Sequence, residues 1–249
     1  MLTYIIAGLT TLGFTTVLTI AGLGAAFILI PVLLLLGVPL LTAMSTALLL
    51  NAIAMFVACL NYAREKLIIF KTAIPIAIAA MIFSPLGART AEYLSEAILK
   101  WIFIIFLLFA ASMILFYKAK ERQIAHGTGR LVFWGILVGI IAGFLGGMLG
   151  VGGGNFIVPF LMFLGFNAKN AAATTAFIVI FSSFSGFLGH VSLGNIDLIL
   201  LVFCAFGSIS GAILGSYLMK NKMSIRQVKI AIGIVLYIVA AKMIFDFFI

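Results

Sequence analysis

The residues best suited to chemistry in this chain form a glycine-rich stretch from Gly146 to Asn155, closed by Pro159. Six of its ten residues are glycine. Each glycine weakens a helix by about 1 kcal/mol relative to alanine, so the run Gly152, Gly153, Gly154 predicts a helix break. The flanking sequence is apolar, and irregular backbone at membrane depth is tolerated only where protein buries it or it lines a cavity. The stretch therefore predicts a ligand site inside a membrane protein.

A helix that begins near Asn155 would present unpaired backbone N–H groups and a positive dipole end, which suit an anion. Glycine lets a ligand approach the backbone, and Asn155 adds a side-chain amide. The alternative is that the glycines only permit close helix packing. We adopt that interpretation for two ladders of small residues, Gly139-Gly143-Gly147 and Gly207-Gly211-Gly215. A dinucleotide or phosphate loop is excluded, because the GxGxxG pattern fails at Asn155 and no Lys-Ser/Thr follows.

Hydroxyl side chains follow each predicted break: Ser45 and Thr46 in the first half of the chain, and Thr174 and Thr175 in the second. They could coordinate an oxyanion from two sides of one central cavity, or they could cap their own helices. Both interpretations stay open. The same holds for polar residues farther along these spans, which could line a path or bond back to a helix: Asn51, Ser182, Ser183 and Ser185.

His190, in the short connector Gly189–Asn195, is the candidate for proton coupling, because histidine titrates near neutral pH. The alternative is an interfacial histidine without a role. No Asp or Glu lies deep in an apolar span, which argues against a carboxylate proton relay. Cys59 and Cys204 lack metal-ligand spacing, so neither a metal nor a cofactor is expected.

The elements that position these residues are membrane spans. Of the 249 residues, 65% are hydrophobic and 8% are charged, and the mean hydropathy is +1.36. Soluble domains are about 45–50% apolar and about 25% charged, so the fold class is all-α and polytopic. The formal net charge of +9 comes from cations in short connectors, where membrane orientation explains them and nucleic-acid binding is not needed.

The apolar sequence divides into two halves with the same layout of four full spans and one short segment after a glycine break. A single constant offset between the halves places Gly24 on Gly152, Pro31 on Pro159 and Gly37 on Gly165. This series of matches indicates an internal duplication. The predicted spans are 2–20, 42–60, 69–88, 98–117, 131–149, 171–189, 196–219 and 228–248, and the short segments are 25–36 and 155–164.

The distribution of the 15 Lys and Arg residues distinguishes eight crossings from ten. With eight crossings the two sides carry eight and seven cations. If the short segments also cross, one side carries twelve cations and the other only three, which are Arg89, Lys100 and Lys242. The positive-inside rule favours ten. We therefore predict two inverted repeats, 1–117 and 131–249, joined by a cytoplasmic linker, 118–130.

The stretch from Gly143 to Pro159, followed by Leu164-Gly165 and Ala172-Ala-Thr-Thr175, closely resembles the TauE/SafE sulfite exporter family. The duplicated layout resembles the family over essentially the whole chain. The resemblance implies a carrier of small sulfur-containing or organic anions in the bacterial inner membrane. One departure is that the first half has Gly22-Leu23-Gly24-Ala25-Ala26 where relatives often have a glycine run. The two half-sites are therefore expected to be unequal.

Together these observations predict a multi-pass inner-membrane transporter that moves sulfite, a sulfonate or a related anion by alternating access, with export as the expected direction. The expected substrate-binding residues come from both halves: Gly152, Gly153, Gly154, Asn155, Thr174, Thr175, Ser45, Thr46 and Gly24. The expected partners are a small anionic solute and the lipid bilayer; nucleic acid is not expected, and a homo-oligomer stays open. An enzyme is not expected, but an intramembrane enzyme and a membrane scaffold or assembly protein remain the alternatives.

Overall fold

The computed structural model describes residues 2–20, 24–116, 128–191 and 198–221, with a few residues between 230 and 245. Every regular element in the described residues is an α-helix, so the all-α prediction is confirmed for them. Most of the predicted span 228–248 and the linker up to residue 127 lie outside the described residues. The helices are α1 (Leu2–Ile20), α2 (Ala26–Leu35), α3 (Leu40–Arg64), α4 (Phe70–Glu92), α5 (Glu96–Phe116), α6 (Thr128–Met148), α7 (Gly154–Phe163), α8 (Ala168–Val191) and α9 (Leu198–Asn221).

The helices have the length and the surface of membrane spans. Four described helices, α3, α4, α8 and α9, are long and apolar enough to cross a bilayer, and α1, α5 and α6 carry shorter apolar stretches. Large apolar side chains such as Phe206, Phe133 and Ile105 are exposed, with Phe206 72% accessible. An exposed apolar surface of this extent fits a lipid environment. The chain is a polytopic membrane protein.

The two halves repeat their helix boundaries. The helices α2, α3 and α4 begin at residues 26, 40 and 70, and α7, α8 and α9 begin at the same constant offset, at 154, 168 and 198. The short helices also end alike, because Gly37 and Gly165 both adopt positive φ, +82° and +96°. The backbone N–H of the residue after each glycine then donates to a carbonyl of the short helix. Val38 donates to Leu33 at 3.0 Å, and Phe166 donates to Leu161 at 3.1 Å. This is the Schellman ending that glycine favours.

Ladders of glycines set the directions of the neighbouring helices. On α6, Gly139, Gly143 and Gly147 face the backbone of Ile76, Ala80 and Ser84 on α4, in that order. The two helices therefore run in the same direction. By the same argument α9 runs parallel to α1, since Gly207, Gly211 and Gly215 face the carbonyls of Gly8, Leu12 and Thr16. A Cβ on any of these glycines would crowd the opposing backbone, so the prediction that both ladders serve close packing is confirmed.

The remaining directions follow from contacts made by α3. It runs opposite to α8, because Asn51 bonds to Ser183 while Leu48 lies against Gly186. It runs parallel to α9, because Ser208 bonds to the Leu50 carbonyl and Ser216 bonds to Asn61. The helix α4 runs parallel to α8, because Phe70 lies edge-on to Phe177 and, farther along both helices, Pro85 lies against Gly189. Thus α1, α3 and α9 run one way, and α4, α6 and α8 run the other.

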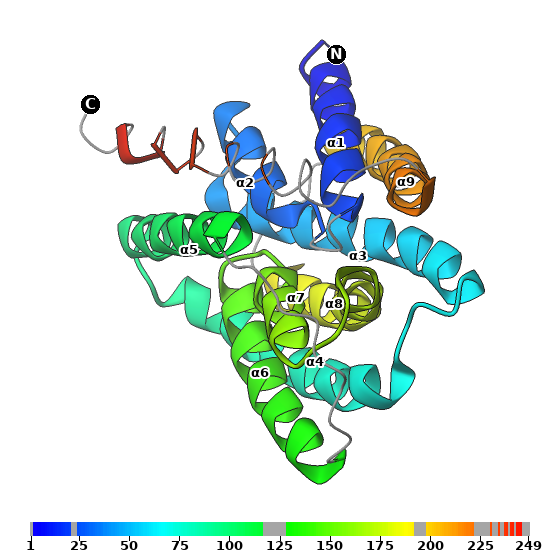
Figure 1. Ribbon diagram of the computed structural model, residues 1–249. Helices are drawn as coiled ribbons and strands as arrows, with labels where there is room; N and C mark the ends of the chain where they lie inside the picture. The colour runs from blue at the N-terminus through cyan, green and yellow to red at the C-terminus, as the bar shows by residue number, and fades with distance from the viewer. Residues whose placement is uncertain are drawn as a thin grey trace.

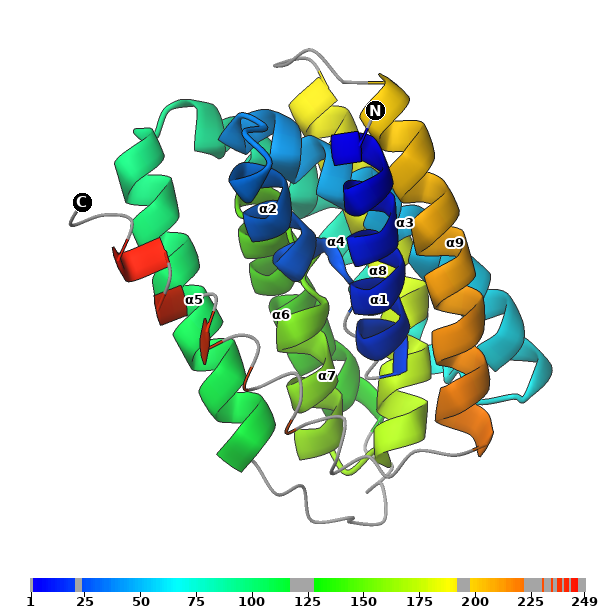
Figure 2. The ribbon, with the colours of Figure 1, turned by 90° about the horizontal axis from the view of Figure 1, so that it is seen from above.

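These directions place the ends of the helices. We call the end where α3 finishes at Arg64 and α8 begins near Lys169 the cationic end. Since α1 and α3 run in the same direction, the segment that contains α2 carries the chain back between them, and the segment that contains α7 does so between α6 and α8. Figure 1 shows α7 and α8 in the centre, enclosed by α3, α4, α5 and α6. Figure 2 shows α5 at one edge of the bundle, far from α1 and α9.

Candidate functional site

The predicted breaks are present, and left-handed glycines form them. After α6, Gly150, Gly152 and Gly153 have φ of +71°, +73° and +78°. Before α2, Gly24 has φ of +76°. Residues with a side chain lose about 1–2 kcal/mol in this region, so glycine is favoured at all four positions. In the first half, Gly22 and Leu23 lie outside the described residues.

Both breaks contact the side chain of Asn51, in the middle of α3. A Cβ added to Gly24 would overlap all three heavy atoms of the Asn51 amide group. A Cβ added to Gly152 would overlap the Nδ2 of Asn51 and the Oγ of Ser183. Asn51 Nδ2 donates a hydrogen bond of 2.9 Å to Ser183 Oγ, which joins α3 to α8 at this point. The two breaks therefore meet where the antiparallel helices α3 and α8 cross, near the middle of both.

The short helices begin at this crossing, and both begin without a side-chain cap. The N-cap residues are Ala25 and Gly153, and neither makes a capping side-chain bond. Both are buried. The first N–H groups of a helix have no acceptor within the helix, so a buried, uncapped start needs another partner. From the crossing α2 runs toward the end opposite the cationic end, and α7 runs toward the cationic end. Two positive helix ends thus lie near Asn51.

Several buried polar atoms near the breaks have no hydrogen-bond partner. Asn155, the second residue of α7, is 4% exposed, and neither its Oδ1 nor its Nδ2 is bonded. The hydroxyls of Thr46 and Thr175 and the Oδ1 of Asn51 are also buried and unpaired. Buried polar atoms normally have partners, because removing one from water without a bond costs about 1–3 kcal/mol. The amides of Asn51 and Asn155 therefore have unused capacity to bond to a ligand at the break.

The other predicted hydroxyls have internal partners. Ser45 donates to the carbonyl of Thr42 at 3.1 Å, and Thr174 accepts the N–H of Ile69 at 3.1 Å. Because α3 and α8 run in opposite directions, the Ser45–Thr46 pair and the Thr174–Thr175 pair lie on opposite sides of the Asn51–Ser183 contact. The structure therefore does not bring the four hydroxyls together. It brings together Gly24, Gly152 and Asn51.

Ser182 of α8 bonds to the second break, whereas Ser185 bonds within its own helix. Ser182 donates to the carbonyl of Gly152 at 2.8 Å and accepts a bond through its own carbonyl from Ser84 Oγ at 2.7 Å. Ser185 bonds back to the Ser182 carbonyl within α8 at 3.2 Å. Of the open alternatives for these residues, Ser182 and Ser185 take the bond to backbone. The Ser182 hydroxyl fixes the position of the Gly152 carbonyl in the break.

His190 does not lie in a connector, because α8 extends to Val191. It is 1% exposed, so its side chain packs against the neighbouring helices. Its Nε2 is 2.9 Å from the carbonyl of Gly147, in the last turn of α6 before the break. Its Nδ1 is buried and unpaired. His190 therefore contacts the start of the second break, at the end opposite the cationic end.

The described residues contain no group of three or more His, Cys, Asp or Glu side chains that could hold a metal ion. The sequence did not single out Asn51 from the other polar residues of its span. The sequence does contain a signal for it. Asn51 is the only Asn inside the apolar segment 42–60, and an uncharged polar residue there needs a partner in a neighbouring helix.

Comparisons with known proteins find one family and several relatives similar to this chain. The family described as Sulfite exporter TauE/SafE matches residues 5–243. "Probable membrane transporter protein YunE" of Bacillus subtilis is 27% identical over 93% of each chain. "Probable membrane transporter protein MJ0441" of Methanocaldococcus jannaschii is 31% identical over 69% of this chain and 66% of its own. "Sulfite exporter TauE/SafE family protein 6" of Arabidopsis thaliana is 28% identical over 48% of this chain and 28% of its own. No solved structure matches the chain.

Proposed function

The chain belongs to the sulfite exporter TauE/SafE family, and we propose that it is a secondary transporter for a small anion: sulfite, a sulfonate or a related sulfur-containing or organic anion. Membership of this family makes it a multi-pass membrane transporter. The proposal adds the substrate class, the bacterial inner membrane as its location and export as its direction. The family description names sulfite, and the printed names of the bacterial relatives name no substrate.

The observation that carries the proposal is the meeting of two buried, uncapped helix starts at Asn51. Uncapped N–H groups and the positive ends of half-helices attract anionic groups of a substrate. Asn155 Nδ2 and the hydroxyls of Thr46 and Thr175 are buried donors without a partner, which an oxyanion would satisfy. We assign the substrate contacts to the backbone N–H groups after Gly24 and Gly152–Gly154, to Asn155 Nδ2 and to the second N–H of Asn51 Nδ2. Thr46 and Thr175 would contact the anion on its way to and from the crossing.

We further propose that the two repeats are inverted. Support comes from the directions of three repeat-related pairs, α1 and α6, α3 and α8, and α4 and α9, whose members run in opposite directions. Inverted repeats around a site at mid-depth are the architecture in which one half rocks against the other to alternate access. The Gly24 and Gly152 breaks would then be two halves of one site. They are unequal, because only the second carries three consecutive glycines and an asparagine.

Ten crossings fit this arrangement. Arg64 ends α3 and Lys169 begins α8, so the two cations lie at the same end. Eight crossings would put them on opposite sides. We therefore place the cationic end in the cytoplasm, in accordance with the positive-inside rule. Single cysteines replacing the exposed Lys66 and Asn167, in a chain with Cys59 and Cys204 removed, test this placement. An impermeant maleimide should label both from the same side of the membrane, and labelling from opposite sides contradicts ten crossings.

Transport itself is tested with purified protein in liposomes loaded with labelled sulfite, methanesulfonate or acetate. Efflux of at least one anion above that of empty liposomes is expected. No movement of any of the three would contradict the transporter proposal and favour a scaffold. Conversion of an anion without its movement would favour an enzyme.

A further inference from the structure

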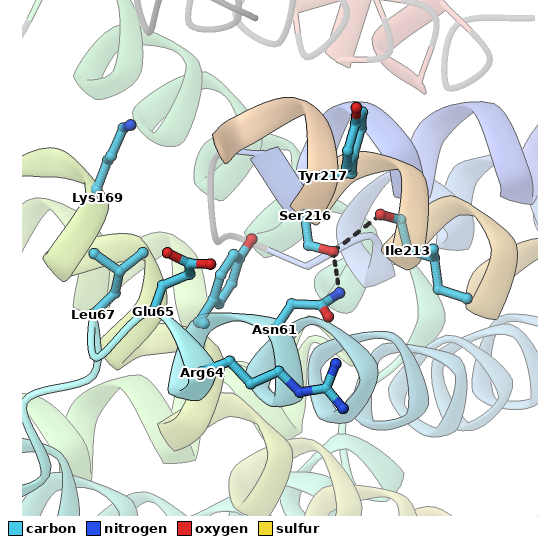
Figure 3. A pocket seen from close by; sticks show the side chains of 9 residues that line it. Asn61, Arg64, Glu65, Leu67, Lys169, Ile213, Ser216 and Tyr217 are labelled. Atoms are coloured by element: carbon cyan, nitrogen blue, oxygen red, sulfur yellow. Dashed lines mark hydrogen bonds between the residues drawn. The ribbon is translucent and has the colours of Figure 1, made fainter. Parts of the chain in front are cut away.

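A cavity of about 480 Å³ opens at the cationic end, between the last turns of α3 and α9 and the start of α8. Figure 3 shows the side chains around it. Arg64 and Lys169 are exposed cations on its wall, and Glu65 is the acidic residue among them. The lining residues are Asn61, Tyr62, Arg64, Glu65, Leu67, Lys169, Ile213, Ser216 and Tyr217.

The wall of this cavity holds one link between α3 and α9 and one between α3 and α1. Asn61 Nδ2 donates to Ser216 Oγ at 2.7 Å. Tyr62 is buried, and its hydroxyl donates to the carbonyl of Thr19 in the last turn of α1 at 2.8 Å. The hydroxyl of Thr19 is itself buried and has no partner. The cavity thus borders α1, the helix that leads to the Gly24 break, and its wall carries two cations, Arg64 and Lys169, beside the acidic Glu65.

The repeat-related position at the opposite end is closed. The offset that relates the two halves takes Asn61, Ile213 and Ser216 to Gly189, Pro85 and Ala88. There a Cβ on Gly189 would lie 2.8 Å from the Ala88 Cβ and 3.0 Å from the Pro85 Cα, closer than side chains normally approach. The backbones of α8 and α4 are therefore in contact. At one end α3 and α9 leave a cavity beside their Asn61–Ser216 hydrogen bond, whereas at the other end the repeat-related helices α8 and α4 pack without space.

We infer that the cavity at Arg64 and Lys169 is the cytoplasmic entrance for the anion and that the structure has it in an open conformation. The contact of Gly189 with Ala88 is then the closed, repeat-related entrance at the opposite end. This rests on the proposed transport function. Positive side chains at a cavity mouth raise the local concentration of anions. In a duplicated protein the two ends can exchange conformations, so closing the cavity around the Asn61–Ser216 hydrogen bond would accompany separation of Gly189 from Ala88.

Charge substitutions test the entrance, with transport of sulfite as the readout. R64Q and K169Q should each raise the KM for sulfite about fivefold at low ionic strength, leave the maximal rate within twofold, and lose most of this effect in high salt. K71Q is the matched control, because Lys71 is an exposed cation at the same end that does not line the cavity. Its KM should stay at the wild-type value. If all three variants behave alike, the cavity is not the entrance. If the wild type moves no anion, the transport function fails instead.

Labelling tests the exchange of the two ends without measuring transport. In a chain lacking Cys59 and Cys204, N61C should react with an impermeant maleimide from the cationic end, and A88C should be protected at least tenfold. G189L, which has no room for its side chain beside Ala88, should reverse this pattern. Adding sulfite without G189L should raise A88C labelling from the opposite side and lower N61C labelling. If A88C reacts freely in the unliganded chain, or if neither G189L nor sulfite changes either rate, the proposed pair of gates is wrong.

Discussion

Gly24 and Gly152 contact one and the same side chain, the amide of Asn51, although they lie in different halves of the chain. Their φ angles, +76° and +73°, agree closely. Each precedes a short helix that starts uncapped in the interior. The duplication therefore brings two equivalent breaks to one point between α3 and α8. A break of this kind in an apolar surrounding is expected where a polar ligand binds.

The first prediction separates backbone strain from crowding of Asn51. Gly24 and Gly37 both have positive φ, +76° and +82°, but only Gly24 lies against another side chain. G24A should lower sulfite efflux at least tenfold, because its methyl group displaces Asn51. G37A should cost about 1–2 kcal/mol of stability and keep transport within threefold. Efflux from liposomes measures the transport of each variant, and thermal unfolding in detergent measures its stability. Equal loss of transport in the two variants would show that strain alone matters.

The second prediction concerns the unpaired amide of Asn155. N155L keeps the branched arrangement of four side-chain heavy atoms and removes two buried polar atoms that have no partner. The variant should be more stable than the wild type by about 1–3 kcal/mol, because burying those atoms without a bond is unfavourable. It should lose the rise in melting temperature on adding sulfite. The control is N167L, whose parent side chain is exposed and bonds to the N–H of Asn170 at 2.8 Å. A less stable N155L, or one that keeps the sulfite shift, contradicts the assignment.

The third prediction is a coupling between Asn51 and Ser183. Their hydrogen bond of 2.9 Å is the contact that ties the two breaks to the crossing of α3 and α8. A double-mutant cycle of N51A and S183A should give a coupling energy of about 1 kcal/mol in thermal or denaturant unfolding. Pairing N51A with S112A, on the distant helix α5, should give additive effects. Coupling in the second cycle as large as in the first would mean that Asn51 acts through global stability.

The fourth prediction separates a proton-coupling role for His190 from a structural one. Its Nε2 bonds to the Gly147 carbonyl, and the amide of glutamine can donate the same bond without titrating. H190Q should therefore fold with wild-type stability, whereas H190A should lose about 1–3 kcal/mol. If His190 couples protons, H190Q should flatten the pH dependence of sulfite efflux between about pH 5 and 8. An unchanged pH profile in H190Q would leave His190 as a residue that only holds the break.

The membrane spans, the two breaks and the repeated layout could be predicted from the amino-acid sequence. They depend on composition and linear spacing alone. A glycine run weakens a helix, and an apolar span of about 20 residues is long enough to cross a bilayer, whichever helices surround it. The predicted boundaries of the short segments differ from those of α2 and α7 by one residue at each end. Several of the longer helices extend farther than predicted at one end, for instance α3 to Arg64 and α8 to Val191.

Which side chains meet depends on how the helices pack, and it could be read only from the three-dimensional arrangement. The packing placed Asn51 between the breaks, separated the two hydroxyl pairs, and buried His190 against Gly147. The physical reason is that most of these helices are apolar on nearly every face, so periodicity does not mark which face is internal. Lateral pairing depends instead on where small residues let backbones approach, as at Gly143 and Ala80. Those contacts join residues far apart in sequence, and no local pattern specifies them.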